Sequence, residues 1–334
     1  MQRRRQLAKT IRWGILATGW IADLFVKDLI QTGHSVAAVG SRAQESADRF
    51  AKIYGIVRAH GSYQALVEDP HVDIIYIATP HPQHVSAAKL ALNAGKHILV
   101  EKPFTLNAKE AAEIVDLARA KGLVVLEAMW TRFLPHMRRI RELIADGMIG
   151  EVRSITADHR QKLPDDPKHR LNALQLGGGA LLDLGIYPVS FAWDILGKPA
   201  SIKAMATFQD TGVDRQIAML FQYASGAIVT TLSSSDSSGP NRASIVGTKG
   251  RIEIDRVWYS PTTFRVHDNE NNILETFDGS VEGRGMQFQA EEAERLVRNG
   301  LIESEIMPPS QSVDIMATLD EVRAQIGLKY PSER

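Results

Sequence analysis

Two short polar segments stand at the ends of apolar, strand-like runs in the first third of the chain. They are Ala78-Thr79-Pro80-His81-Pro82-Gln83-His84 and Val100-Glu101-Lys102-Pro103-Phe104. Open α/β sheets bind ligands at the carboxyl ends of their parallel strands, so both segments are expected to border a ligand site. A lysine in that place can hydrogen-bond a substrate oxygen and lower the cost of deprotonating it. Lys102 is therefore a candidate catalytic residue.

A glycine-rich run much later in the chain brings two further reactive side chains. The sequence GGGALLDLGIY, residues 177 to 187, indicates a helix start with Asp183 and Tyr187 one turn apart on one face. A hydride acceptor, a cation and a tyrosine are sufficient for alcohol oxidation. On the residues alone, Tyr187 is equally typical of a half-buried core tyrosine. Asp183 is equally typical of a carboxylate placed at a helix start by the dipole.

The segment from Trp13 to Ala22 predicts a strand, a tight turn and a helix start, where a dinucleotide pyrophosphate meets backbone N–H groups. Gly19 and Ala22 fit the second and third positions of the pattern G-x-G-x-x-G/A, whereas Ala17 occupies the first. A side chain at Gly19 would block the pyrophosphate. A turn without a ligand fits the same residues. We assign the cofactor contacts of this turn to Ala17, Thr18, Gly19, Trp20 and Ile21.

The end of the second strand carries independent information about the cofactor. Ser41 and Arg42 lie about twenty residues beyond Gly19, where NAD enzymes carry an acidic residue for the ribose 2′-hydroxyl. A hydroxyl and a guanidinium there suit a 2′-phosphate instead. The pair favours NADP over NAD, although a solvated arginine at a helix start would look the same.

The remaining cofactor contacts are assigned to the ends of the next strands: Thr79, Pro80, His81, His84, Glu101 and Lys102. His81 and His84 have a spacing that a metal ion could use. However, Pro82 suggests a first helical turn with His81 as its cap, and no third ligand is evident. We therefore expect no metal.

Several polar and aromatic residues stay open. Trp130, Arg132 and Phe133 either line the site or seal the junction between domains. His159, His169 and Arg170 either reach the substrate or lie in a solvated loop. The loop from Gln161 to Leu176 should shape the substrate pocket, but its sequence has no motif that identifies the substrate.

The elements that position these residues change character along the chain. The first 130 residues alternate strand and helix patterns, which implies a parallel sheet wound with helices. Strands are expected at Ile11–Ala17, Ser35–Ser41, Ile74–Ala78, His97–Val100 and Val124–Glu127, with helices at Ile21–Gln31, Ala43–Tyr54, Tyr63–Glu68, His84–Ala94 and Ala108–Lys121.

After a helix at Met137–Ala145, strands follow one another and imply a large open, mostly antiparallel sheet. They are expected at Glu151–Arg160, Ile202–Gln209, Asp214–Tyr223, Ala227–Ser233, Arg242–Val246, Arg251–Asp255, Thr263–Val266 and Ile273–Phe277. Helices at Gly285–Arg298 and Ser310–Ile326 follow, and the last should pack back towards the first domain. We expect an α/β fold with an NADP-binding Rossmann domain, residues 1–130, and a substrate-binding and oligomerisation domain, residues 131–334.

Composition excludes several classes of protein. The 334 residues contain 39 Lys plus Arg and 39 Asp plus Glu, so no overall field favours nucleic acid or an anionic membrane. No run approaches the ~18 apolar residues of a membrane span. The chain has no Cys, which excludes disulfides and thiolate chemistry and suits a cytoplasmic location. We interpret residues 1–8 as a frayed tail.

The ordered set of motifs resembles the family of glucose–fructose oxidoreductase and inositol dehydrogenase, the Gfo/Idh/MocA family. The resemblance rests on Glu-Lys-Pro at 101–103, the Ala-Thr-Pro before His81 and the glycine-rich run into Asp183. The segments at 127–135, 246–250 and 326–331 are similar to its branch of dimeric dihydrodiol dehydrogenases and NADP-dependent D-xylose 1-dehydrogenases. The likeness runs from about residue 11 to 331.

The resemblance implies roles residue by residue. Lys102 would be the catalytic lysine, with a cis peptide before Pro103, and Tyr187 the proton-transfer residue. Asp183 would contact substrate hydroxyls or orient the lysine. The substrate would be a sugar, a polyol or a trans-dihydrodiol, and the enzyme a homodimer or higher homo-oligomer joined through its open sheet. Two alternatives remain: a ketosugar reductase, for example of 1,5-anhydrofructose, and a non-catalytic NADP-binding sugar sensor.

Overall fold

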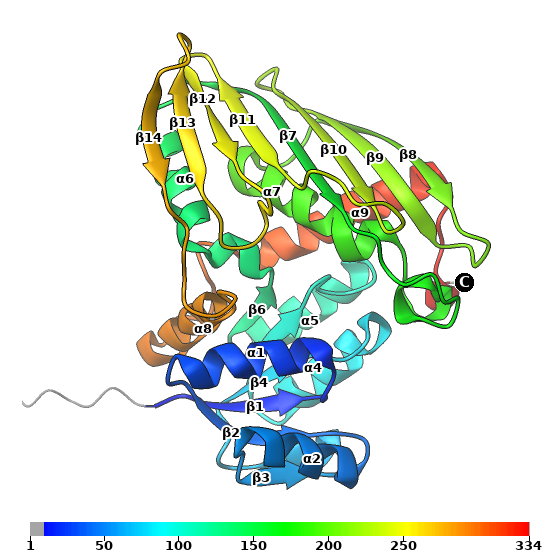
Figure 1. Cartoon of the computed structure of the whole chain (residues 1–334). Coiled ribbons are helices and arrows are strands. Elements are labelled where there is room, and N and C mark those ends of the chain that lie inside the picture. The colour runs from blue at the N-terminus through cyan, green and yellow to red at the C-terminus, as the bar shows by residue number, and fades with distance from the viewer. Residues whose placement is uncertain (1–9, 334) are drawn as a thin grey trace, which may run out of the picture.

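The computed structural model describes residues 10–333, and its first half is built on a parallel sheet, sheet A (Figure 1). The expected tail, residues 1–8, lies outside the described residues. Short runs of Val, Ile and Leu form the strands of sheet A because helices cover both of its faces. These strands are β1 (Arg12–Leu16), β2 (Ser35–Gly40), β3 (Arg58–His60), β4 (Ile74–Ile77), β5 (His97–Glu101) and β6 (Val125–Ala128).

The helices between these strands begin and end where local residues favour it. They are α1 (Trp20–Gln31), α2 (Gln44–Tyr54), α3 (Tyr63–Glu68), α4 (His84–Asn93) and α5 (Ala108–Lys121). The side chain of Asn107 accepts a hydrogen bond from Glu110 N and caps α5, and Gly122 ends α5 in the left-handed region.

Sheet A has the strand order β3-β2-β1-β4-β5-β6, the order of a doubly wound dinucleotide-binding sheet. The strand order reverses between β1 and β4, so the crevice for a ligand opens at their carboxyl ends. The expectation of a parallel, doubly wound sheet is confirmed. The sequence did not predict β3, a strand of three half-buried residues at the edge of the sheet.

A 3-10 turn, Trp130–Phe133, and helix α6 (Pro135–Ala145) lead from β6 into a second sheet, sheet B. Its strands in chain order are β7 (Val152–Arg160), β8 (Ser201–Phe208), β9 (Asp214–Gln222), β10 (Ile228–Ser234), β11 (Ala243–Gly247), β12 (Gly250–Ile254), β13 (Phe264–Asp268) and β14 (Ile273–Phe277).

Sheet B is ordered β14-β13-β12-β11-β7-β10-β9-β8, and its pairs are antiparallel except for β7 and β10, which run parallel. The expected succession of strands is therefore confirmed, with one parallel pair that strand succession does not reveal. Helices α7 (Ile186–Leu196) and α9 (Pro309–Ile326) lie on the same side of this sheet in Figure 1.

The end of the chain returns to the first sheet. Helix α8 (Gln287–Asn299) packs near α1, and α9 packs against α5, as expected for the last helix. Trp13 at the start of β1 donates its indole N–H to Glu294 of α8 at 2.8 Å. The division of the chain at 130–131 stays a prediction, but residues from beyond it clearly complete the layers around sheet A.

Candidate active site

Lys102 stands directly after β5 and reaches across to the second half of the chain. The peptide between Lys102 and Pro103 is cis, as the resemblance implies. Lys102 Nζ donates to the backbone carbonyl of Asp183 at 2.8 Å and to its Oδ1 at 3.2 Å. The two side chains retain only 12% and 10% of their exposure, so this ion pair is nearly removed from water. The structure thus brings together residues that lie 81 positions apart.

Asp183 offers two acceptors to the lysine, its backbone carbonyl and its Oδ1. It lies in a π-helical turn, Leu181–Gly185, directly before α7. Asp183 and Tyr187 were expected one α-helical turn apart, and the wider turn was not predicted.

Tyr187 lies against the same ammonium group. Lys102 Nζ is 4.9 Å from the centroid of the Tyr187 ring. The Tyr187 hydroxyl accepts a hydrogen bond of 3.0 Å from Nε1 of Trp130. His159 meets the Tyr187 ring edge-on at 4.8 Å and stacks on Tyr259 at 3.7 Å. Lys102, Asp183 and Tyr187 therefore converge beside a group of aromatic rings.

The charges in this cluster depend on one another. Burial alone would raise the pKa of Asp183, but Lys102 and Arg170 outweigh it and hold that pKa well below its usual range. Burial alone would lower the pKa of Lys102, yet the carboxylate of Asp183 leaves it raised. Lys102 therefore stays an ammonium group near neutral pH. Burial raises the pKa of Tyr187, although Lys102 and the Trp130 N–H act in the opposite direction.

The turn after β1 has the geometry that its residues suggest. Ala17 has a φ of 86°, in the left-handed region, where the usual motif places a glycine. A side chain at Gly19 would meet no protein atom within 4 Å, so protein packing does not require a glycine there. The open space lies at the amino end of α1, as a pyrophosphate needs. Trp20 is 68% exposed beside it.

Two more observations fit a dinucleotide at this edge of sheet A. Arg42 is exposed just beyond β2 and has no ion pair within residues 10–333, so its donors are available to an anion. The hydroxyl of Thr79 is buried after β4, and no described residue forms a hydrogen bond with it. A buried polar atom without a partner costs free energy unless a ligand completes its bonding.

His84 and Glu101, unlike Thr79, already form hydrogen bonds within the protein. Both ring nitrogens of His84 lie 3.0 Å from carbonyl oxygens, those of Pro103 and Thr79, so this buried ring links the two polar segments. Glu101 accepts from the Tyr76 hydroxyl and from Lys102 N, and burial raises its pKa to about 7. Direct contacts of His84 and Glu101 with a cofactor stay a prediction.

One detail of the histidine pair was wrong. His81 does not cap the turn that contains Pro82, because it begins the 3-10 turn His81–Gln83 and Pro80 precedes it as the cap. Its Nδ1 instead contacts the carbonyl of Gly177 at 3.1 Å, and burial lowers its pKa to about 3. Within residues 10–333, no group of three or more potential metal ligands occurs.

The residues left open by the sequence take distinct places. Trp130 contacts the candidate site through its hydrogen bond to the Tyr187 hydroxyl. Arg132 and Phe133 are buried at the junction between the two halves of the chain. Arg132 binds Ser190 of α7 through its Nε at 2.8 Å, which ties the junction together. Arg170 approaches Asp183 at 3.5 Å. His169 caps a short turn, Arg170–Asn172, within the expected substrate loop.

His159 is not in a solvated loop. It is buried on β7, and burial together with Lys102 lowers its pKa to about 3. Its alternation with Ile155 and Ala157 was the signal that could have placed it inside. Sequence reasoning missed Tyr259 altogether, because nothing around it predicts contact with Tyr187.

One stretch, Leu174–Leu196, is long and apolar enough to cross a membrane by composition, but 83% of its most apolar window is buried inside the protein. It contains α7 and covers sheet B, which is the position of a core helix.

Known families match both halves of the chain. Residues 11–129 match an oxidoreductase family with an NAD-binding Rossmann fold, and residues 137–253 match the GFO/IDH/MocA C-terminal domain. The chain belongs to the GFO/IDH/MocA oxidoreductase family. As a member, it is an NAD(P)-binding oxidoreductase that acts on CH–OH groups.

Relatives match this GFO/IDH/MocA protein over nearly its whole length. The trans-1,2-dihydrobenzene-1,2-diol dehydrogenase of Mus musculus is 38% identical over 333 residues, covering 97% of this chain and 99% of the mouse protein. The Homo sapiens dehydrogenase of the same name is 35% identical over 336 residues, with the same coverage of both chains.

A 3-ketoreductase from Actinomadura kijaniata, solved with NADP and TDP-benzene, superposes with a TM-score of 0.84 at 26% identity. The match covers 95% of this chain and 98% of the ketoreductase.

Proposed function

We propose that this protein is an NADP-dependent dehydrogenase that oxidises a hydroxyl-bearing carbon of a trans-dihydrodiol, sugar or polyol. The convergence of Lys102, Asp183 and Tyr187 at the carboxyl edge of sheet A carries this proposal. The names of the mouse and human relatives support the diol, and the ketoreductase supports redox chemistry between a C–OH and a C=O group.

The residues divide the reaction between them. Bound NADP supplies the hydride acceptor, so the substrate C–H loses a hydride as its O–H loses a proton and a C=O bond forms. Tyr187 takes the proton, and Lys102 stabilises the negative charge that develops on the oxygen. Asp183 keeps the ammonium group charged and in place through its two acceptors. Trp130 orients the Tyr187 hydroxyl.

Proton transfer by Tyr187 requires help from its surroundings. A free tyrosine has a pKa of ~10, and burial raises the pKa of Tyr187 further. The nearby ammonium group of Lys102 favours the phenolate and opposes this rise. We therefore expect oxidation to become faster at alkaline pH, and the reverse reduction to use the neutral tyrosine as an acid at neutral pH.

NADP is proposed over NAD because Ser41 and Arg42 stand where a ribose-binding carboxylate would be. No Asp or Glu occupies this strand end, and the Arg42 side chain is free of ion pairs within the described residues. The bound NADP of the ketoreductase supports the same choice.

We also propose a homodimer, or a higher homo-oligomer, formed through the open face of sheet B. The helices on this sheet lie on one side in Figure 1. The strand register puts four exposed apolar residues together on one face of the sheet, Met205, Leu220, Ile228 and Val246, which are 37% to 81% exposed. A second copy would remove this apolar surface from water. Light scattering at micromolar concentration should give at least twice the monomer mass. A cytoplasmic location remains our proposal on the absence of cysteine.

A substrate screen tests the function directly. Purified protein should reduce NADP in the presence of at least one trans-dihydrodiol, pentose, hexose or inositol. Faster NADPH oxidation with ketosugars than any forward reaction would favour the ketosugar reductase. Binding of NADP and a sugar without turnover in either direction would overturn the enzyme in favour of a sensor.

A further inference from the structure

A cleft of about 500 Å³ adjoins the catalytic cluster. This volume lies in the range of small-molecule sites. Trp130 and Tyr259 line the cleft. Trp130 donates to the Tyr187 hydroxyl at 3.0 Å, and the Tyr259 ring lies 5.4 Å from the Tyr187 ring. The cleft is therefore next to the proposed proton-transfer residue.

The lining of this cleft is cationic. It contains no Asp or Glu, and its charged residues are Arg160, Lys162, Arg256 and Arg284. Gln161 and Asn241 add neutral hydrogen-bond donors. Positive charges that line a cleft without carboxylates create a local positive potential, although the whole chain is neutral.

The four cations differ in how far the protein neutralises them. Arg160 pairs with Asp158 at 2.9 Å, and Lys162 pairs with Asp165 at 2.8 Å. Arg256 and Arg284 form no ion pair within residues 10–333. The guanidinium of Arg284 lies 5.7 Å from the centre of the Trp130 ring, which holds it beside the catalytic cluster. Arg256 and Arg284 are thus the donors that an anion can use.

We infer that the substrate carries an anionic group, a carboxylate or a phosphate, which Arg256 and Arg284 bind in this cleft while the reacting carbon lies beside Lys102 and Tyr187. Guanidinium groups match both anions through paired N–H donors. This inference rests on the proposed dehydrogenase function and narrows its substrate class. The anionic group itself does not react: the hydride still passes to NADP and the proton to Tyr187.

Three hexoses that differ only at carbon 6 test this inference. D-glucose is neutral there, D-glucuronate carries a carboxylate, and D-glucose 6-phosphate carries a phosphate. With NADP present, at least one anion should have a kcat/KM about tenfold or more above that of glucose, the gain expected from one charge-assisted contact. Preference for glucuronate alone identifies a carboxylate substrate, and preference for the phosphate alone identifies a phosphorylated one.

Variants locate the effect. Arg256→Ala and Arg284→Ala should each raise KM for the preferred anion about tenfold relative to KM for glucose. Arg256→Lys should recover part of the loss because it keeps the charge. Arg242→Ala is the matched control: Arg242 follows the lining residue Asn241 and is 65% exposed, but it does not line the cleft. An equally large rise in KM for the anion in Arg242→Ala would indicate a general positive potential on this surface, and it would overturn the inference.

Calorimetry of the NADP complex separates the two proposals. If the anions bind more tightly than glucose and Arg256→Ala abolishes the difference, the anion site stands even where no hexose is turned over. If glucose and other neutral substrates are oxidised while the anions show neither tighter binding nor faster turnover, the dehydrogenase stands and the anion site is wrong. If no anion binds more tightly or reacts faster than its neutral counterpart, the anion site is wrong, and the wider screen of dihydrodiols, sugars and polyols decides the dehydrogenase separately.

Discussion

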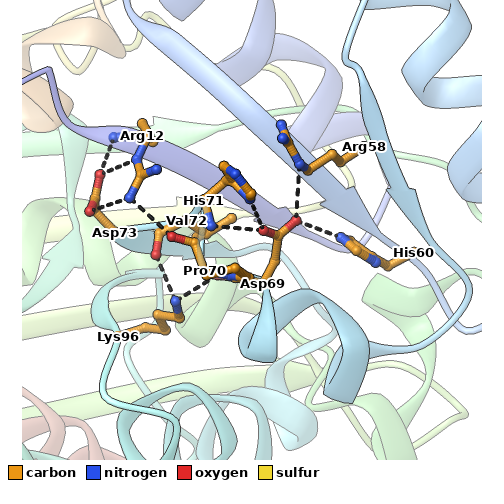
Figure 2. A network of polar contacts seen from close by, with 9 residues as sticks. All are labelled: Arg12, Arg58, His60, Asp69, Pro70, His71, Val72, Asp73 and Lys96. Atoms are coloured by element: carbon orange, nitrogen blue, oxygen red, sulfur yellow. Dashed lines mark hydrogen bonds and ion pairs between the residues drawn. The ribbon is translucent and has the colours of Figure 1, made fainter.

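Two polar clusters lie at opposite edges of sheet A, and they differ in what their charged groups bind. The cluster in Figure 2 gathers around the amino ends of β1, β4 and β5, and we call it the amino-edge network. Its members are Arg12, Arg58, His60, Asp69, His71, Asp73 and Lys96. The other cluster is the active-site cluster of Lys102, Asp183 and Tyr187 at the carboxyl edge.

Every charged group in the amino-edge network forms a hydrogen bond or an ion pair with another part of the protein. Asp73 accepts from Arg12 N, Nε and Nη2 at 2.8–3.0 Å. Asp69 accepts from His60 and His71, and Lys96 donates to the carbonyls of Asp69 and Val72 at 2.7 Å. Such a network fixes the starts of three strands and leaves nothing for a ligand.

The carboxyl edge keeps a buried hydroxyl without a partner and buried carboxyl groups with shifted pKa values. The Thr79 hydroxyl has no hydrogen-bond partner within residues 10–333, and burial raises the pKa of Glu101 and Glu127 to about 7. Unmet polar groups and shifted pKa values gather where a ligand completes the site. The amino edge thus pairs its charged groups with one another, whereas the edge that carries the active-site cluster also keeps an unpartnered hydroxyl and carboxyl groups with raised pKa values.

The largest expected effect concerns the rate. Tyr187→Phe should lower kcat by about 10²–10⁴, because it removes only the proton acceptor, and Lys102→Met by about 10²–10³. NADP affinity and the free energy of unfolding should change little. Since both groups act on one oxygen, the double variant should lose little more than the worse single variant. Steady-state kinetics on an active substrate measure this, and native turnover in both variants would refute the assigned roles.

The next effect distinguishes the two edges of sheet A by how the free energy of unfolding depends on pH. The carboxyl group of Glu127 on β6 is buried, and burial raises its pKa from 4.5 to about 7 although Ser312 and Arg132 oppose the rise. Between these values the unfolded chain releases a proton that the folded protein retains, so Glu127 should cost stability as pH rises. Relative to Glu127→Gln, the native protein should lose about 3 kcal/mol of unfolding free energy from pH 4 to pH 8. Equal slopes in urea titrations across that range would contradict it.

The amino-edge network should respond in the opposite direction. Burial would raise the pKa of Asp69, but bonds from His71 and His60 hold it lowered. Its stabilising contribution is therefore present at neutral pH and is lost as pH falls below about 4. Asp69→Asn should cost about 1.5–3 kcal/mol at pH 7. Its kcat should remain native, whereas a fall in kcat of the folded variant would show that the network does reach the site.

The smallest expected effect concerns cofactor choice. Arg42→Ala should weaken NADP binding about tenfold, because one exposed charge-assisted contact is lost, and should leave NAD binding unchanged. Titration calorimetry with both cofactors measures this. Arg49→Ala on α2 is a suitable control, since Arg49 is exposed and contacts only Ser46 in the described structure. Equal affinity of the native protein for NADP and NAD would remove the basis of the choice.

The sequence by itself determined the elements and most of the reactive residues. Apolar runs and helical periods placed five strands and five helices of the first half within a few residues, because these patterns are local. Lys102 was recognisable because a Glu-Lys-Pro segment ends a strand, and Tyr187 because a glycine-rich run precedes it. The second sheet followed from strand succession alone.

Tertiary structure decided which strands pair and which side chains are in contact. The edge strand β3 and the parallel pairing of β7 with β10 depend on partners distant in sequence, which local patterns do not encode. The contact of Tyr259 with Tyr187 and the burial of His159 are equally non-local. The π-helical turn that carries Asp183 was likewise not predictable from the local pattern. Residue types fixed which chemistry was possible, and long-range packing fixed the distances and the water exclusion on which that chemistry depends.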